Sequence, residues 1–80
     1  MFEIAIHYFG MLTDKTGKST EKISIDNHLT IEALNQLLIQ KYQGLKTAKY
    51  KIALNNHFVD AQQLVTANAE ISLLPPFSGG

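Results

Sequence analysis

The sequence predicts an α+β fold in which a mixed sheet of about five strands is covered on one face by one main helix. Apolar residues alternate with period 2 near both ends of the chain, and they repeat with a helical period in the middle. Polar or glycine-containing segments separate these stretches. Because one helix can cover only one face of a sheet, we expect two layers. A chain of 80 residues has room for a single domain of this kind.

The first strand is predicted over residues 2–9, because the segment FEIAIHYF alternates and is rich in β-branched and aromatic side chains. Its inward face consists of Phe2, Ile4, Ile6 and Tyr8. Residues 13–20 are polar and include a glycine, so they predict a loop. A second strand follows over residues 21–25. The two strands and their loop indicate an N-terminal hairpin.

The only helix that the pattern supports lies over residues 29–44. Thr30 suits the N-cap position, and Gly44 suits the C′ position just beyond the last turn. The apolar residues of this segment recur on one helical face, which consists of Ile31, Leu34, Leu37, Leu38 and Tyr42.

Three further strands are predicted over residues 50–54, 58–60 and 70–74. A tight turn at residues 55–57 joins the first two, since asparagine tolerates positive φ. Residues 61–69 have no clear period and are expected to hold one helical turn, anchored by Leu64 and Val65, before Asn68 supplies a left-handed turn. The order β-β-α-β-β-β, with the first and last strands side by side in the centre of the sheet, is typical of the ubiquitin-like β-grasp fold.

Composition argues against several classes of protein. Seven lysines balance seven acidic residues and there is no arginine, whereas a nucleic-acid-binding protein usually has a basic excess that includes arginine. No apolar run is long enough to span a membrane, and the N-terminus does not resemble a targeting segment. We therefore expect a cytoplasmic protein that binds neither nucleic acid nor membrane. The chain has no cysteine, so neither a disulfide nor a cysteine metal site can add to its small core.

Metal binding and hydrolase chemistry are not expected either. The three histidines, His7, His28 and His57, lie in a predicted strand, a loop and a turn, with no carboxylate at ligand spacing to complete a site. Nothing places Ser72 or Ser78 beside a base, so a serine–histidine–aspartate arrangement is not supported. The histidines are expected to be surface or half-buried residues.

The last six residues, PPFSGG, form a predicted flexible tail (residues 75–80) after a domain of residues 1–74. The two prolines lack amide hydrogens, so strand pairing cannot continue through them and the chain leaves the sheet as a stiff segment. At ~3.3 Å per residue the tail reaches roughly 20 Å. Gly79 and Gly80 make its tip thin, and a carboxylate on such a tip can enter a slot that any Cβ would block. Either the chain end is itself the substrate of a partner, or it is a frayed end without function.

The segment EISLL runs directly into PPFSGG over residues 70–80. This ending resembles that of the small subunit of molybdopterin synthase, a family of ubiquitin-like sulfur carriers whose chains finish with a strand, two prolines, an apolar residue, a variable residue and Gly-Gly. The resemblance extends to YFGML at 8–12, TIEALNQLLIQKY at 30–42 and IALNNHFV at 52–59. Residues 12–14 and 67–70 depart from the family's pattern, and neither segment touches the tail.

The resemblance implies a sulfur carrier in molybdenum cofactor biosynthesis, with Gly80 as the reactive residue and Gly79 beside it. An E1-like adenylyltransferase would use ATP to adenylate the Gly80 carboxylate, and a sulfur donor protein would convert it to a thiocarboxylate. The large subunit of molybdopterin synthase, in a heterotetramer of two small and two large subunits, would accept the tail and pass the sulfur to a cyclic pyranopterin precursor. A dithiolene needs two sulfurs, and so two loaded carriers. Catalytic residues are expected on the large subunit, and this chain is expected to bind no cofactor or metal.

Apolar residues near the root of the tail are candidates for binding this partner. If the first and last strands are neighbours, Phe9 and Leu74 lie together on the sheet face away from the helix, where they suit the core of an interface. The alternative for Phe9 and Phe58 is that they are ordinary core residues. The candidate set is Phe9, Phe58, Leu74, Pro75, Pro76, Phe77 and Ser78. A mildly basic stretch, which is either a solvated face or a match for an acidic partner groove, contains Lys46, Lys49 and Lys51.

Three other functions remain open. A sulfur carrier for thiamine biosynthesis shares the fold, but that family is usually shorter and lacks the double proline. A ubiquitin-like modifier, joined to lysines of target proteins through Gly80, begins with the same adenylate. A simple interaction module with an idle tail is the third alternative.

Overall fold

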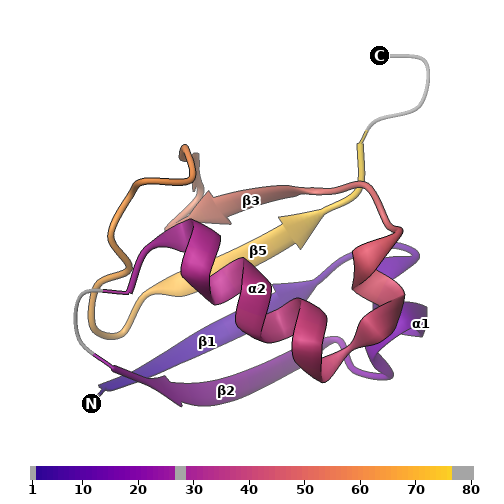
Figure 1. Cartoon of the computed structure of the whole chain (residues 1–80), viewed down its shortest axis with the longest axis horizontal. Helices are drawn as coiled ribbons and strands as arrows, with labels where there is room; N and C mark the ends of the chain where they lie inside the picture. Colours follow the sequence, from indigo (N-terminus) through magenta and orange to yellow (C-terminus); the bar gives the residue numbers. More distant parts are fainter. Residues whose placement is uncertain (1, 27–28, 77–80) are drawn as a thin grey trace.

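The structure is a computed structural model that describes residues 2–26 and 29–76, which form a five-stranded sheet and one main helix. The strands are β1 (Phe2–Tyr8), β2 (Thr20–Ile25), β3 (Lys51–Leu54), β4 (His57–Phe58) and β5 (Glu70–Leu74). They are arranged in the order β2-β1-β5-β3-β4, and the helix α2 (Ile31–Lys41) crosses one face of the sheet (Figure 1). The predicted two-layer α+β architecture is confirmed.

The first and last strands pair in parallel at the centre of the sheet, as the sequence predicts. Ile6 lies opposite Ile71 in this pair, and antiparallel pairing of β1 with β2 confirms the N-terminal hairpin. β5 also pairs antiparallel with β3, where Leu73 lies opposite Ile52. Because paired residues point to the same side of a sheet, the inward face of β1 continues across β5 and β3.

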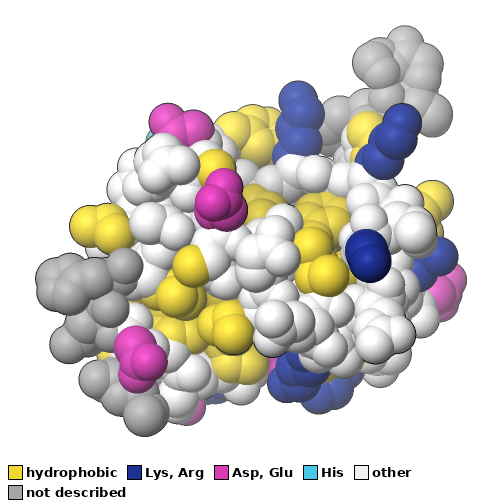
Figure 2. Space-filling model, in the orientation of Figure 1, with side chains coloured by type: hydrophobic (Ala, Val, Ile, Leu, Met, Phe, Trp, Pro, Cys, Tyr) yellow, Lys and Arg dark blue, Asp and Glu magenta, His cyan; other side chains and the backbone are white. Residues whose placement is uncertain are grey.

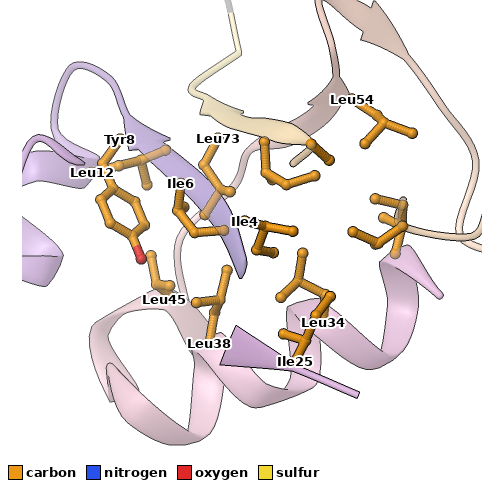
Figure 3. Packing of buried hydrophobic residues seen from close by; sticks show 14 residues of the cluster. Ile4, Ile6, Tyr8, Leu12, Ile25, Leu34, Leu38, Leu45, Leu54 and Leu73 are labelled. Atoms are coloured by element: carbon orange, nitrogen blue, oxygen red, sulfur yellow. The ribbon is translucent and has the colours of Figure 1, made fainter. Parts of the chain in front are cut away.

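The core lies between this inward face and α2 (Figure 3). Side chains from the central strands meet the apolar stripe of the helix, and the stripe's most buried members are Ile31, Leu34 and Leu38. The largest fully buried side chains of the domain are Ile4, Ile6, Leu12, Leu34, Leu38, Leu45, Ile71 and Leu73. All of them are aliphatic, so the described phenylalanines, Phe2, Phe9 and Phe58, do not fill the centre of the core.

Helix α2 begins as predicted but ends earlier than residue 44. The Thr30 hydroxyl accepts a hydrogen bond from the Ala33 N–H, which confirms the N-cap. The chain leaves the helix at Tyr42, whose backbone is extended, and continues as a 3₁₀ helix, η1 (Gln43–Lys46). The prediction of Gly44 as a left-handed C′ residue is therefore wrong. A Cβ at Gly44 would lie 3.3 Å from the Lys15 side chain, so this glycine instead allows two segments to approach closely.

A short helix that the sequence did not predict, α1 (Leu12–Thr16), overlaps the start of the predicted loop at residues 13–20. Five residues are too few to reveal a helical period. Its tertiary anchor is Leu12, which is completely buried, and the Thr16 hydroxyl donates to the Leu12 carbonyl. Gly17 ends the helix in the left-handed conformation. No helix among the described residues is long and apolar enough to span a membrane.

The segment between β3 and β5 differs from the prediction in two places. Asn55 and Asn56 both have positive φ and form the tight turn, so His57 belongs to β4, which covers two residues rather than 58–60. Residues 61–69 contain no helical turn. Val65 is buried as expected, but Leu64 is 45% exposed and forms an isolated bridge with Thr30 instead. Asn68 has the predicted left-handed conformation.

One carboxylate ties three elements together at the end of the sheet. The Glu21 side chain on β2 is only 7% exposed, and it accepts hydrogen bonds from Tyr8 Oη at 2.7 Å, Tyr42 Oη at 2.6 Å and Lys41 Nζ at 2.8 Å. Burial alone would raise the pKa of Glu21, but the hydrogen bonds from Lys41, Tyr42 and Tyr8 outweigh it and lower the pKa to about 2. Burial and the bond to Glu21 also raise the pKa of Tyr8.

We expect Glu21→Gln to lower the free energy of unfolding by about 2–3 kcal/mol at pH 7. Because the pKa of Glu21 is below its usual 4.5 in the folded protein, its contribution is fully present above about pH 4.5 and is lost as the pH falls towards 2. Urea unfolding measured from pH 7 to pH 2 should show the two proteins converging in that window. Glu3→Gln, at an exposed position, is the control and should cost less than about 0.5 kcal/mol. A difference that persists undiminished at pH 2 would contradict the assignment.

Candidate functional site

The face of the sheet opposite α2 is not covered by any element of the described chain, and the tail starts at its edge (Figure 1). Strand register assigns residues to this open face. Leu74 lies opposite Lys51, and Ala53 lies opposite both Ser72 and Phe58, whereas the alternate residues of β3 and β5 pack into the core. We name the apolar residues of this face nearest the tail, Phe9, Phe58, Leu74, Pro75 and Pro76, the docking surface.

Phe9 lies directly after β1 and beside the end of β5. Its backbone N–H donates to the Leu73 carbonyl at 3.2 Å, which extends the parallel pairing by one residue. Its ring centroid is 6.5 Å from that of His7, and its side chain is 46% exposed. Phe9 is therefore a surface residue at the root of the tail, and the alternative that it belongs to the core is wrong.

Phe58 is the most exposed large apolar residue of the described chain, at 61%. It lies opposite Ala53, which is only 4% exposed although it points away from the helix, so neighbouring side chains on the open face cover it. The Lys51 ammonium lies 5.6 Å from the centre of the Phe58 ring, within range of a cation–π interaction. The core alternative is wrong for Phe58 as well, and Phe58 and Leu74 flank Lys51 on the same face.

The first residue of the tail rests against the loop that follows β1. Pro75 is half-buried, and Gly10, at φ +59°, lies so close that a Cβ there would be 3.0 Å from Pro75 Cγ. Pro76 is exposed. β5 ends at Leu74, as predicted. The other tail residues in the candidate set, Phe77, Ser78, Gly79 and Gly80, lie outside the described residues.

The open face also holds a polar pair that sequence spacing did not reveal. His7 Nε2 lies 3.2 Å from Glu70 Oε1, although the two residues are 63 positions apart, because β1 and β5 are neighbours. His57 is on β4 and His28 lies outside the described residues. Within residues 2–26 and 29–76, no three potential metal ligands come together.

Gly10 is a site residue that the sequence did not predict, and the contacts of Lys51 with Leu74 and Phe58 were not predicted either. The segment YFGML contains Gly10, but nothing local indicates that its neighbour in space is Pro75. Lys51 belongs to the basic stretch that the sequence indicates, and the strand register places it between Leu74 and Phe58. Both contacts depend on strand pairing between distant segments, which a single sequence does not show.

We expect Gly10→Ala to destabilise the domain by about 1–3 kcal/mol, because it combines left-handed strain with a clash against Pro75. Gly17→Ala is a matched control: Gly17 also has positive φ, at +78°, but nothing lies within 4 Å of its added Cβ. Chemical unfolding should show a larger loss for Gly10→Ala, and amide chemical shifts of Phe9 and Leu74 should change only in that variant. Equal losses and unchanged shifts in both variants would mean that Pro75 does not rest on Gly10.

Comparison with known proteins agrees with the sequence prediction. The chain is 29% identical to the molybdopterin synthase sulfur carrier subunit of Emericella nidulans, and the alignment covers 100% of both chains. Its fold is similar to that of a putative molybdopterin converting factor subunit 1 from Pyrococcus furiosus, with a TM-score of 0.91, 15% identity and coverage of 96% of this chain and 100% of the other. The fold is also similar to that of SAMP1 from Haloferax volcanii, with a TM-score of 0.84, 19% identity and coverage of 98% of this chain and 99% of the other. These neighbours confirm the ubiquitin-like β-grasp fold.

A further solved structure contains two different subunits. The chain is 27% identical to a chain in the complex of subunits 1 and 2 of molybdopterin-converting factor from Helicobacter pylori, with a TM-score of 0.70 and coverage of 99% and 100%. Residues 6–80 match the ThiS family, which is nearly the whole chain, tail included. The resemblance to the molybdopterin synthase small subunit is thereby confirmed, and the chain belongs to the ThiS family.

Proposed function

We propose that this chain is the sulfur carrier subunit of molybdopterin synthase, and that Gly80 carries the sulfur as a thiocarboxylate. The observation that carries the proposal is the docking surface: apolar side chains remain exposed around the point where a tail ending in Gly-Gly leaves the sheet. A full-length relative named as a molybdopterin synthase sulfur carrier subunit supports it. The chain contributes the reactive terminus, and the catalytic residues belong to the large subunit.

The chemistry proceeds through activation of the terminal carboxylate. One carboxylate oxygen of Gly80 attacks the α-phosphorus of ATP on an E1-like adenylyltransferase, and pyrophosphate leaves. A hydrosulfide equivalent from a sulfur donor protein then attacks the acyl carbon, the bond to AMP breaks, and the thiocarboxylate remains. The thiocarboxylate sulfur then bonds to a carbon of the cyclic pyranopterin precursor and displaces an oxygen substituent, which gives a thioester. Water attacks the Gly80 acyl carbon, the carbon–sulfur bond breaks, the sulfur stays on the precursor and the carboxylate is restored. Two such cycles supply the two sulfurs of a dithiolene.

The geometry suits delivery of this terminus into another protein. The docking surface supplies an apolar area that a partner can cover, and six residues, 75–80, span at most roughly 20 Å when fully extended. The contact between Pro75 and Gly10 fixes the direction in which the tail starts. The Helicobacter pylori complex of subunits 1 and 2 supports a large subunit as the partner. We propose a heterotetramer of two small and two large subunits.

The most specific alternative is a protein modifier joined to lysines through Gly80. Structures of small archaeal modifier protein 1 from Haloferax volcanii and Methanosarcina acetivorans, with TM-scores of 0.85 and 0.79, share this fold. Fold and tail suit both functions, because both start from the same adenylate. A sulfur carrier for thiamine biosynthesis is the other alternative, and the double proline at residues 75–76 argues against it.

We expect the protein to gain about 16 Da when it is incubated with an E1-like adenylating enzyme, ATP and sulfide, because one oxygen of the Gly80 carboxylate is exchanged for sulfur. Intact-mass spectrometry measures this gain. High-mass adducts with other proteins would favour the modifier instead. If neither the mass gain nor the adducts form in the presence of a competent adenylating enzyme, the result would favour an interaction module with an idle tail.

Deletion of Gly80 should abolish the mass gain and leave the folded domain intact, because the described core ends at β5. The free energy of unfolding, measured by thermal denaturation, should change by less than about 0.5 kcal/mol. A stability loss of several kcal/mol, or sulfur loading that survives the deletion, would contradict a tail that acts outside the domain.

Phe58→Ala should weaken binding of the large subunit by ~1–3 kcal/mol if the docking surface is the interface core. Leu37→Ala is the matched control, because Leu37 is also an exposed apolar residue, at 47%, but lies on α2 in the opposite layer. Isothermal titration calorimetry with a co-purified large subunit measures the binding affinity of both variants. Equal affinities for Phe58→Ala and the parent, with a loss for Leu37→Ala, would place the interface on the helix side.

A further inference from the structure

The fold separates charges that cancel in the sequence. Six of the seven lysines lie at the end of the domain where β1 and β5 finish and the tail starts, accompanied there by only two carboxylates, Asp14 and Glu21. Figure 2 shows lysine side chains gathered towards this end. The six lysines are Lys15, Lys18, Lys41, Lys46, Lys49 and Lys51.

The opposite end of the domain has the reverse balance. It contains the starts of β1 and β5, the end of β2 and the first turn of α2. Lys22, whose partner in the sheet is Ala5, is the one lysine on this side. The carboxylates there are Glu3, Asp26, Glu32, Asp60 and Glu70. A chain with a formal net charge of zero is therefore strongly dipolar, and its positive pole surrounds the root of the tail.

Part of this positive pole serves the domain itself. Glu21 holds Lys41 at 2.8 Å and Lys18 at 3.5 Å. Within the described ranges, no carboxylate lies within 4.0 Å of the remaining four lysines of this end. Three of the four follow one another along the chain from the last residue of η1 to the first residue of β3. We name them the lysine rim: Lys46, Lys49 and Lys51.

The lysine rim meets the docking surface at Lys51 and extends from there towards the helix layer, where Lys46 lies near Gln40 and Gln43. Lys51 lies opposite Leu74 in the sheet, and its ammonium lies over the Phe58 ring. Lys46 ends η1, and Lys49 lies in the connection that leads into β3. A partner that covers Phe58 and Leu74 and receives the tail must therefore meet the Lys51 ammonium, while Lys49 and Lys46 add positive charge to the same end of the domain.

We infer that the lysine rim steers the domain, tail end first, onto a protein surface rich in carboxylates around the entrance that receives the tail. This inference rests on the proposed function, because it takes the tail as the inserted element. Complementary charge raises association rates by 10–10³-fold and is screened over about 8 Å at physiological ionic strength. The acidic opposite end of the domain also favours the tail-first orientation, because a carboxylate-rich surface repels that end.

A pair of variants with equal net charge isolates the position of the charges. Lys46→Gln, Lys49→Gln and Lys51→Gln together remove three positive charges from the rim. Gln62→Glu, Gln63→Glu and Thr66→Glu together add three negative charges at exposed positions of the opposite end. Both proteins carry a net charge of −3, so any difference between them arises from where the charge lies.

The first measurement needs no partner. A ten-residue glutamate peptide is titrated into the ¹⁵N-labelled protein at low salt. Amide shifts should move in residues 44–51 and in Leu74, and these changes should fade at 0.5 M NaCl. The rim variant should lose them and the control should keep them. Shifts spread over the whole domain, or unchanged in the rim variant, would overturn the inference.

The second measurement uses stopped-flow association with a co-purified large subunit. The rim variant should associate at least about 10-fold more slowly than the control at 50 mM salt, and the two should converge at 0.5 M. Equal rates at low salt would overturn the inference even if binding itself is normal. If the parent protein does not bind the large subunit at all, the proposed function fails, and the peptide titration still decides whether the rim recognises carboxylates.

Discussion

The parallel pairing of β1 with β5 is the constraint on which the rest of the structure depends. It brings the two ends of the chain's folded part to the centre of the sheet and gives each strand a neighbour on both sides. Because parallel strands run in the same direction, β1 and β5 finish at the same edge. The loop after β1 therefore lies where the tail begins, and Phe9 and Gly10 can contact Leu73 and Pro75.

This arrangement explains why apolar side chains remain exposed at one place. The helix α2 and the inward faces of the strands form a core of mainly aliphatic residues, and Phe9 and Phe58 lie outside it on the open face. Their burial would require a second layer on the open face, which the described chain does not supply. A partner that provides this layer gains the hydrophobic free energy that the isolated domain leaves unused, at roughly 25 cal/mol per Å² of apolar area covered.

The sequence was most informative where a signal is local and periodic. Alternation in β1 and β5, the helical stripe from Ile31 to Leu38 and the Thr30 cap all follow from neighbours within a few positions. The errors have the opposite origin. α1 is held by the burial of Leu12, and Gly44 serves an approach to Lys15, so tertiary contacts override what the local residues indicate.

The candidate site was predicted in part for the same reason. Its apolar members could be identified because strand order followed from the pattern, whereas the contacts of Gly10 and Lys51 needed the register between strands. The gathering of lysines at the tail end and of carboxylates at the other end likewise depends on how the strands pair, which the sequence alone does not show.

Two features of the tail end act at different stages of an encounter. Charge acts over several ångströms and decides how often the tail end approaches first, while the apolar docking surface contributes only when water has been expelled from it. Exposed ammonium groups at an interface edge add little to affinity, since they remain hydrated. Placing lysines around the contact and aromatic rings within it therefore lets the rate of capture and the lifetime of the complex be set by separate residues. The proposed function requires a carrier to leave one partner in order to meet the next, and for that task fast capture with moderate affinity is the more useful combination.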